Sequence, residues 1–144
     1  MDEKAKEKIS QWLKIFSEFG PRTAMAHLDA RPISLDHNHF MIESTMSDAH
    51  RQPMGLLHGG ISLLFAETVA SFHSAFLCDL EKVAPVGVDI NGTHLSSAKS
   101  GDIRITATLL RQASSFIFHE VEVYHIDAGR VLCKARVTNY LKPL

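Results

Sequence analysis

The sequence has little of several features that commonly reveal what a protein binds. Its 15 basic and 16 acidic side chains nearly cancel, which gives no electrostatic case for binding nucleic acid or a membrane surface. It has two cysteines, Cys78 and Cys133, too few for a disulfide framework, and we therefore expect a reducing, cytoplasmic location. No apolar run approaches the ~20 residues of a membrane-spanning helix, and the charged N-terminus lacks the apolar segment of a secretory signal.

Several catalytic and cofactor motifs are also missing. Gly55, Gly59 and Gly60 form neither a dinucleotide-binding nor a P-loop fingerprint. The nine histidines are dispersed without the spacing of a zinc site, so we predict no metal and no cofactor. What is present is a chain of 144 residues that is 45% hydrophobic and 22% charged, which indicates a globular protein with one main domain.

The hydrophobic pattern predicts an α+β fold. Residues 3–19 have apolar side chains at helical spacing, so we expect residues 1–22 to contain an amphipathic N-terminal helix ahead of a single domain over 23–144. Residues 58–77 are apolar nearly all round, which predicts a long buried helix. Alternating or strand-like patterns predict strands over these ranges: 39–46, 84–95, 103–110, 115–125 and 131–140. Short connections favour an antiparallel sheet that curls around the long helix.

The long helix carries its polar residues on one face. Gly60, Glu67, Ser71 and Ser74 are spaced by seven, four and three residues and therefore lie in line. A carboxylate in a buried helix has a high desolvation cost unless it is paired, hydrated or neutral. We therefore predict that Glu67 is functional. The structural alternative is that its side chain reaches the surface or pairs with an arginine. His73 faces away from Glu67 and is expected to be structural.

The start of the same helix indicates where a substrate would be polarised. Gly59 and Gly60 allow close backbone approach and leave N–H groups unbonded at the helix N-terminus, which suits a developing oxyanion. Glu67 lies about two turns further on, ~11 Å along the axis, which is too far for both groups of one chain to act easily on one small carbonyl. We therefore predict sites that are shared between two copies of the chain.

The segment from Gln52 to Gly60, with the sequence QPMGLLHGG, is followed by Ala66-Glu67-Thr68 and resembles the hotdog-fold acyl-CoA thioesterases. The likeness is closest to the PaaI-like branch, which contains 4-hydroxybenzoyl-CoA and 1,4-dihydroxy-2-naphthoyl-CoA thioesterases and the enterobactin-pathway proofreading thioesterase. Residues 86–95, VGVDINGTHL, are similar to a second stretch of that branch. The resemblance covers roughly residues 25–140. It implies a hotdog fold in a homodimer or homotetramer with intersubunit active sites.

The resemblance also implies roles for individual residues. Glu67 matches the catalytic carboxylate, acting as nucleophile or as general base on water, and the Gly59 N–H matches the group that polarises the thioester carbonyl. The other catalytic candidates are polar side chains expected near that carbonyl or near Glu67: Gln52, His58 and Ser71. The expected substrate contacts are Met54, Gly60, His94 and Arg111. The enterobactin-pathway relative has a Gly-Arg pair where this chain has Ala113-Ser114. Arg111, two residues before Ala113, is the expected replacement for that arginine.

These features favour an enzyme that hydrolyses an aryl- or medium-chain acyl thioester of coenzyme A or of a carrier protein, with coenzyme A present only as part of the substrate. Two alternatives stay open. A hotdog hydratase or dehydratase would need an acid–base pair across the acyl β-carbon, for which Glu67 with His58 or His94 is available. A non-catalytic acyl-CoA-binding protein would have no need of a carboxylate at position 67.

Overall fold

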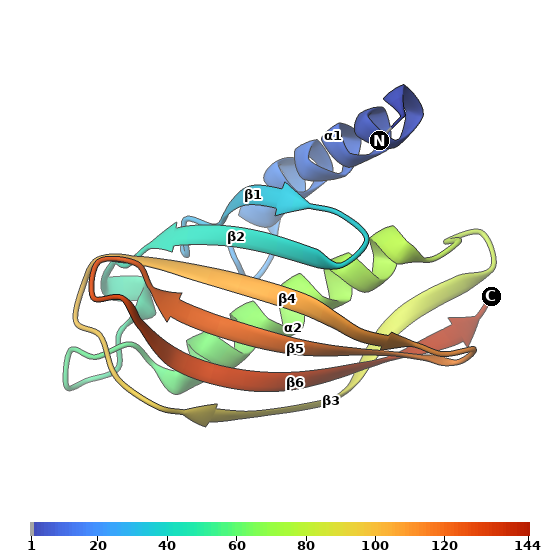
Figure 1. Cartoon of the computed structure of the whole chain (residues 1–144). Helices are drawn as coiled ribbons and strands as arrows, with labels where there is room; N and C mark the ends of the chain where they lie inside the picture. Colours follow the sequence, from blue (N-terminus) through green and yellow to red (C-terminus); the bar gives the residue numbers. More distant parts are fainter. Residues whose placement is uncertain (1) are drawn as a thin grey trace.

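The computed structural model describes residues 2–144 and shows one antiparallel sheet curled around a long helix (Figure 1). The helices are α1 (Glu3–Phe19) and α2 (Gly59–Leu77), with short 3-10 turns at Gly20–Arg22 and Asp48–His50. The strands are β1 (Arg31–Leu35), β2 (His39–Thr45), β3 (Val83–His94), β4 (Asp102–Gln112), β5 (Phe116–His125) and β6 (Arg130–Pro143). The predicted α+β class, with an additional N-terminal helix, is confirmed.

The strands lie in the order β1-β2-β4-β5-β6-β3, and each neighbouring pair is antiparallel. Five of the six strands match the predicted ranges. The exception, β1, was not predicted because it has only five residues and contains Pro32, which lacks an N–H donor and suits only an edge strand. The 12-residue β3 forms the opposite edge, and on its outer side it pairs with no strand in the described part of the chain.

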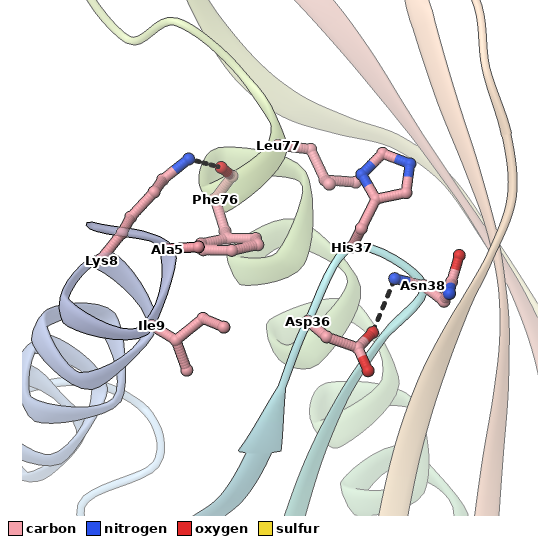
Figure 2. A pocket seen from close by; sticks show the side chains of 8 residues that line it. All are labelled: Ala5, Lys8, Ile9, Asp36, His37, Asn38, Phe76 and Leu77. Carbon is pink, nitrogen blue, oxygen red and sulfur yellow. Dashed lines mark hydrogen bonds between the residues drawn. The ribbon is translucent and has the colours of Figure 1, made fainter. Parts of the chain in front are cut away.

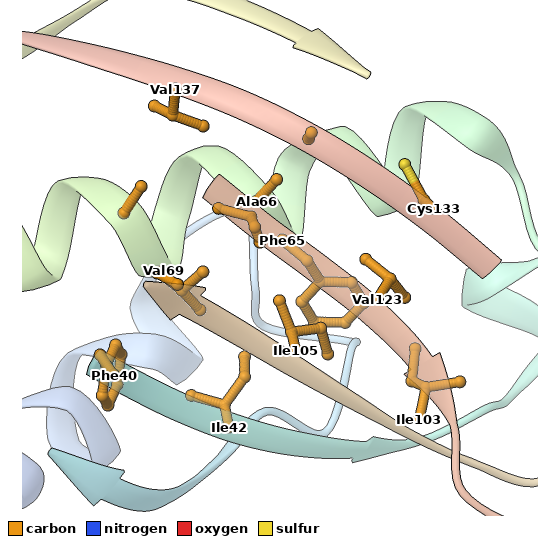
Figure 3. Packing of buried hydrophobic residues seen from close by; sticks show 14 of the residues in the cluster. Phe40, Ile42, Phe65, Ala66, Val69, Ile103, Ile105, Val123, Cys133 and Val137 are labelled. Atoms are coloured by element: carbon orange, nitrogen blue, oxygen red, sulfur yellow. The ribbon is translucent and has the colours of Figure 1, made fainter. Parts of the chain in front are cut away.

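The core lies between the concave face of the sheet and α2. Side chains alternate between buried and partly exposed along β2, β4 and β5, as the period of two requires. The fully buried side chains of these strands and of α2 include Phe40, Ile42, Ile103, Ile105, Val123, Phe65, Ala66 and Val69 (Figure 3). By length and composition alone α2 could cross a membrane, but the core helix of a globular domain passes the same test.

Strand β3 crosses α2 closely because two of its residues have no side chain. A Cβ atom on Gly92 would lie 2.7 Å from Leu63 Cδ2, and one on Gly87 would lie 2.6 Å from Glu67 Oε1. Side chains cannot approach each other this closely, so glycine at these positions lets the strand rest on the helix. The last residue of β3, His94, is thereby brought to the first residue of α2, Gly59.

Helix α1 packs against the C-terminal half of α2. The Trp12 ring makes edge contacts with Phe72 and Phe76, with ring centroids 5.2 Å and 5.8 Å apart. Phe16 is buried, and its ring lies 5.0 Å from that of Phe72. Lys8 Nζ donates a hydrogen bond to the Phe76 carbonyl oxygen at 3.0 Å. These contacts give α1 a packing role, and the domain boundary at residue 22 stays a prediction.

Candidate active site

The start of α2 presents one backbone donor that the protein does not use. His58 is the N-cap residue, and its Nδ1 accepts a hydrogen bond from the Gly60 N–H at 2.8 Å. The His58 N–H in turn donates to the His50 carbonyl oxygen at 2.8 Å. No acceptor for the Gly59 N–H is found among residues 2–144. Of the two N–H groups predicted as oxyanion donors, the Gly59 N–H is the one left for a ligand, because the Gly60 N–H donates to the His58 cap.

The cap also fixes the tautomer of His58. Because Nδ1 accepts from the Gly60 N–H, it carries no proton in the neutral ring, and the proton sits on Nε2. His58 is exposed, so this second nitrogen is available as a hydrogen-bond donor to a bound group. His58 directly precedes Gly59, so this donor belongs to the residue at the positive end of the helix dipole.

His94 lies directly against Gly59. A Cβ atom on Gly59 would be 2.6 Å from His94 Nε2. The imidazole therefore covers the face of the helix N-terminus where a side chain at position 59 would stand. This contact explains in physical terms why glycine is required at position 59.

A cavity of about 230 Å³ adjoins this helix start and is partly lined by Gln52, Gly59 and His94. Gln52 is half-buried, and its Oε1 accepts a hydrogen bond from the Met54 N–H. Within residues 2–144 its amide NH₂ donates to no acceptor, so it can donate to a ligand. The sequence analysis missed the other polar residues of the wall, Ser62, Ser96 and Ser97. Ser62 lies on α2, whereas the position of Ser96 and Ser97 depends on where β3 ends, which spacing does not reveal.

A buried histidine below the site supports the loop that leads to α2. His50 is fully buried, its Nδ1 accepts from the Ser47 N–H at 3.0 Å, and its Nε2 lies 2.9 Å from Ser44 Oγ. Burial lowers the pKa of His50, which favours the neutral ring that this pattern requires. The His50 carbonyl oxygen then holds the N–H of His58. Sequence reasoning gave no signal for this residue.

The expected burial of Glu67 is wrong for the single chain. Glu67 is exposed, although Ala66 before it and Val69 two residues after it are fully buried in the core. The reason is topological: this side of the helix lies under the edge strand β3, where Gly87 has no side chain to cover the carboxylate. The desolvation argument therefore does not apply to the isolated chain. The case for a functional Glu67 depends instead on its position beside the outer edge of β3, which pairs with no strand of the described chain.

Ser71 and Ser74, one and two turns after Glu67, share a partner on the sheet. Ser74 Oγ donates to Asn139 Oδ1 at 3.1 Å, and Asn139 Nδ2 donates to Ser71 Oγ at 2.9 Å. Ser74 and Asn139 are fully buried, whereas Ser71 is half-buried. The predicted polar line along α2 is thus present, and Asn139 of β6 is an additional member.

The chain brings some of the predicted site residues together and separates others. The group at the start of α2 comprises Gln52, His58, Gly59, Gly60 and His94. Glu67 and Ser71 lie further along α2. Glu67 is about 12 Å from Gly59 along the helix axis. Met54 is 81% exposed in the preceding loop, and its side chain does not line the cavity. Arg111 is exposed near the β4–β5 turn, at the end of the molecule where α2 ends (Figure 1).

A larger hollow, of about 500 Å³, lies away from all these groups. Figure 2 shows it between α1, the end of α2 and the β1–β2 turn, with Lys8, His37 and Phe76 among the residues that line it. Lys8 is engaged with the Phe76 carbonyl oxygen. The hollow contains neither Gly59 nor Glu67, and we assign it no part in the chemistry.

His73 belongs to a buried pair of histidines, which agrees with the expectation that it is structural. His73 and His119 are both fully buried, with His73 Nδ1 and His119 Nε2 2.8 Å apart. His73 Nε2 lies 2.9 Å from the Asp36 carbonyl oxygen and must donate to it, because a carbonyl only accepts. His119 then donates to His73 Nδ1, and its own buried Nδ1 has no partner among residues 2–144. Burial holds both rings neutral and lowers the pKa of His119 to about 3.

The comparisons with known proteins agree with this geometry. The sequence profile of the thioesterase superfamily matches residues 54–133. The chain is 29% identical to the 1,4-dihydroxy-2-naphthoyl-CoA hydrolase of Escherichia coli, with 92% of this chain and 95% of that enzyme covered. A mutant thioesterase from Pseudomonas aeruginosa is 25% identical, with a TM-score of 0.87 over 92% of this chain and 94% of its own.

A protein from Staphylococcus aureus provides a further comparison. It is 29% identical, with a TM-score of 0.81 over 85% of this chain and all of its own. One of its structures carries alanine in place of a glutamate, and another, called a thioesterase enzyme, carries alanine in place of a glutamine. The two substituted positions are fifteen residues apart, which is the spacing of Gln52 and Glu67 in this chain. These structural matches confirm the predicted hotdog fold.

Proposed function

This chain belongs to the thioesterase superfamily and is a thioester hydrolase, and from that premise we propose that it cleaves acyl-CoA thioesters into a free acid and coenzyme A. Within that class we propose aryl or medium-chain acyl groups as substrates. The observation that carries the proposal is the unbonded Gly59 N–H beside a cavity that also presents Gln52 and His94. The E. coli relative, which is named for an aryl-CoA substrate, supports the aryl assignment.

The site residues act on the thioester in a defined order. The carbonyl oxygen accepts the Gly59 N–H, with Gln52 and His58 as further donors, so negative charge that develops on oxygen meets fixed dipoles. The ionised Glu67 attacks the carbonyl carbon or removes a proton from an attacking water. The tetrahedral intermediate collapses as the carbon–sulfur bond breaks, and coenzyme A leaves as a thiolate that takes up a proton. On the general-base route this step gives the free acid directly. On the nucleophile route it leaves an anhydride between the acyl group and Glu67, which water hydrolyses to the free acid and the regenerated carboxylate. The residue spacing shared with the S. aureus protein supports the pairing of Gln52 with Glu67.

We further propose that each site is shared between two copies of the chain. Within one chain Glu67 lies about two helical turns from Gly59, too far for both to contact one carbonyl carbon and its oxygen. The edge strand β3 offers the route to a partner, since its outer backbone groups pair with no strand of the described chain. Val86 and Val88 on this strand are 43% and 56% exposed. Exposed apolar side chains at a strand edge favour association with another chain. A second copy on this edge would bring its Gly59 to Glu67.

The carboxylate is tested by Glu67→Ala. We expect kcat for thiol release from benzoyl-CoA or octanoyl-CoA to fall at least ~10²-fold, the scale expected for loss of a nucleophile or general base. Because Glu67 is exposed in the chain, the thermal unfolding midpoint should stay near the wild-type value. Glu81→Ala, which removes an exposed carboxylate after α2, serves as the matched control and should keep full activity. Near-native turnover by the Glu67→Ala protein would refute the assignment.

The two alternative functions give different signals in the same experiment. A hydratase would remove the ultraviolet band of an enoyl-CoA without releasing thiol. A binding protein would show calorimetric heat with acyl-CoA and no turnover. Thiol release that depends on Glu67 excludes both as the main activity, and the acyl group with the highest kcat/KM identifies the substrate class.

A further inference from the structure

We propose that Asn139 is a positioning residue for the reaction: it orients the Ser71 hydroxyl so that its proton is directed to Glu67 or to the water that Glu67 activates. The proposal rests on the hydrolase function proposed above. Asn139 lies on β6, and 72 residues separate it in sequence from Glu67. It reaches the site only through Ser71, so it is not itself expected to touch the substrate.

Asn139 is a polar exception on an apolar face. The inward-facing residues of β6 around it, Ala135, Val137 and Leu141, are apolar and buried. An amide at such a position costs free energy unless its donor and acceptor are both satisfied. Here both are satisfied by hydroxyls of α2, one on each side: Ser74 and Ser71. Asn139 therefore supplies the buried Ser74 hydroxyl with a partner and, in addition, presents a donor to Ser71.

The two ends of the Asn139 amide face different hydroxyls. The amide oxygen faces the fully buried Ser74 and accepts its hydroxyl proton, and the NH₂ group faces Ser71. Ser71 Oγ accepts that N–H at 2.9 Å.

With its oxygen occupied in this way, the Ser71 hydroxyl still has its own proton to donate. No acceptor for that proton is found in the described chain, including the carbonyl oxygen four residues earlier. By contrast, Ser17 in α1 does make this local bond, to the Leu13 carbonyl oxygen. Ser71 stands one turn after Glu67 on the same face of α2, so the free proton is available to the carboxylate or its water. The hydrogen bond from Asn139 thus orients Ser71 so that its hydroxyl does not bond the carbonyl oxygen four residues earlier, and the Ser71 hydroxyl remains a donor.

The test is a double-mutant cycle on kcat. We expect Ser71→Ala and Asn139→Leu each to lower kcat about tenfold with KM within about twofold, because both remove one charge-assisted hydrogen bond formed during the reaction. If Asn139 acts through Ser71, the double variant also loses about tenfold. Independent effects would multiply to about a hundredfold and would overturn the proposal. Asn139→Val, smaller and well suited to a strand, replaces the leucine variant if that protein does not fold.

Two further proteins make each outcome interpretable. Val137→Ala shortens a buried side chain two residues away on β6 and should lower stability while kcat stays within about twofold. Equal losses of kcat in Val137→Ala and Asn139→Leu would overturn the positioning role. Glu67→Ala, measured in parallel, separates the two proposals. If it is inactive while Asn139→Leu turns over at the wild-type rate, only the inference about Asn139 fails, whereas an active Glu67→Ala protein removes the proposed function.

Discussion

At the scale of single residues, one added methyl group at position 59 should separate activity from stability. In Gly59→Ala the new Cβ would stand 2.6 Å from His94 Nε2, so the imidazole must shift and disturb the wall of the cavity in which the carbonyl is expected to bind. We expect kcat/KM to fall roughly tenfold or more. The free energy of unfolding should change by less than about 1 kcal/mol, because the higher helix propensity of alanine offsets part of the cost of moving one imidazole. Steady-state kinetics and urea unfolding of the same preparation check both parts.

The control is Gly20→Ala, at the end of α1, where an added Cβ meets no atom within 4 Å and the backbone is already right-handed helical. It should leave kinetics unchanged. Wild-type kcat/KM in Gly59→Ala would show that His94 and the backbone of position 59 do not form the carbonyl site.

The sequence predicts which residues gather at the candidate site better than it predicts how exposed they are or which distant residues contact them. Gln52, His58 and Gly59 are found together because they are close in the chain and belong to one motif. Glu67 is correctly placed on α2, but its exposure depends on which strand lies at the edge of the sheet, which local patterning does not encode. Asn139 and His119 could not be predicted, since each acquires its role from a partner far away in sequence.

At the scale of elements, the long β3 edge and the distance along α2 predict complementation between two impaired copies of the chain. A dimer of Glu67→Ala with Gly59→Ala contains one site in which both mutations meet and one site in which both residues are native. Mixing equal amounts after reversible unfolding should therefore restore about a quarter of wild-type turnover, because about half of the dimers are mixed and each has one native site. Each parent protein, treated alone, provides the baseline.

A site confined to one chain gives the opposite result, since every site then carries one mutation and mixing restores nothing. The patterns of α1, α2 and five of the strands are strong enough to predict these elements from sequence. The pairing of β3 with a second copy has no such signal. The prediction derives instead from the fold, which places a 12-residue strand with exposed valines at an open edge.

At the scale of the whole molecule, the buried His73–His119 pair links stability to pH. It joins the β1–β2 turn, α2 and β5 through the Asp36 carbonyl oxygen and two neutral rings. Burial lowers the pKa of both histidines, to about 3 for His119, from the ordinary value of 6.5. Below pH 6.5 the unfolded chain therefore binds more protons than the folded one, and the free energy of unfolding falls as the pH falls.

We expect His119 to contribute a loss of about 1.4 kcal/mol in the free energy of unfolding between pH 7.5 and 5.5, with His73 adding a loss in the same direction and neither contributing a dependence above pH 7.5. His119→Leu should be less stable than the wild type at pH 7.5, because His73 Nδ1 loses its donor, but should show a shallower decline toward acid. Urea unfolding at the two pH values measures both quantities. His27→Leu, which removes an exposed histidine, should retain the wild-type decline. An unchanged decline in His119→Leu would mean that the pair does not stay neutral in the folded protein, and the acid sensitivity would have to arise from other groups.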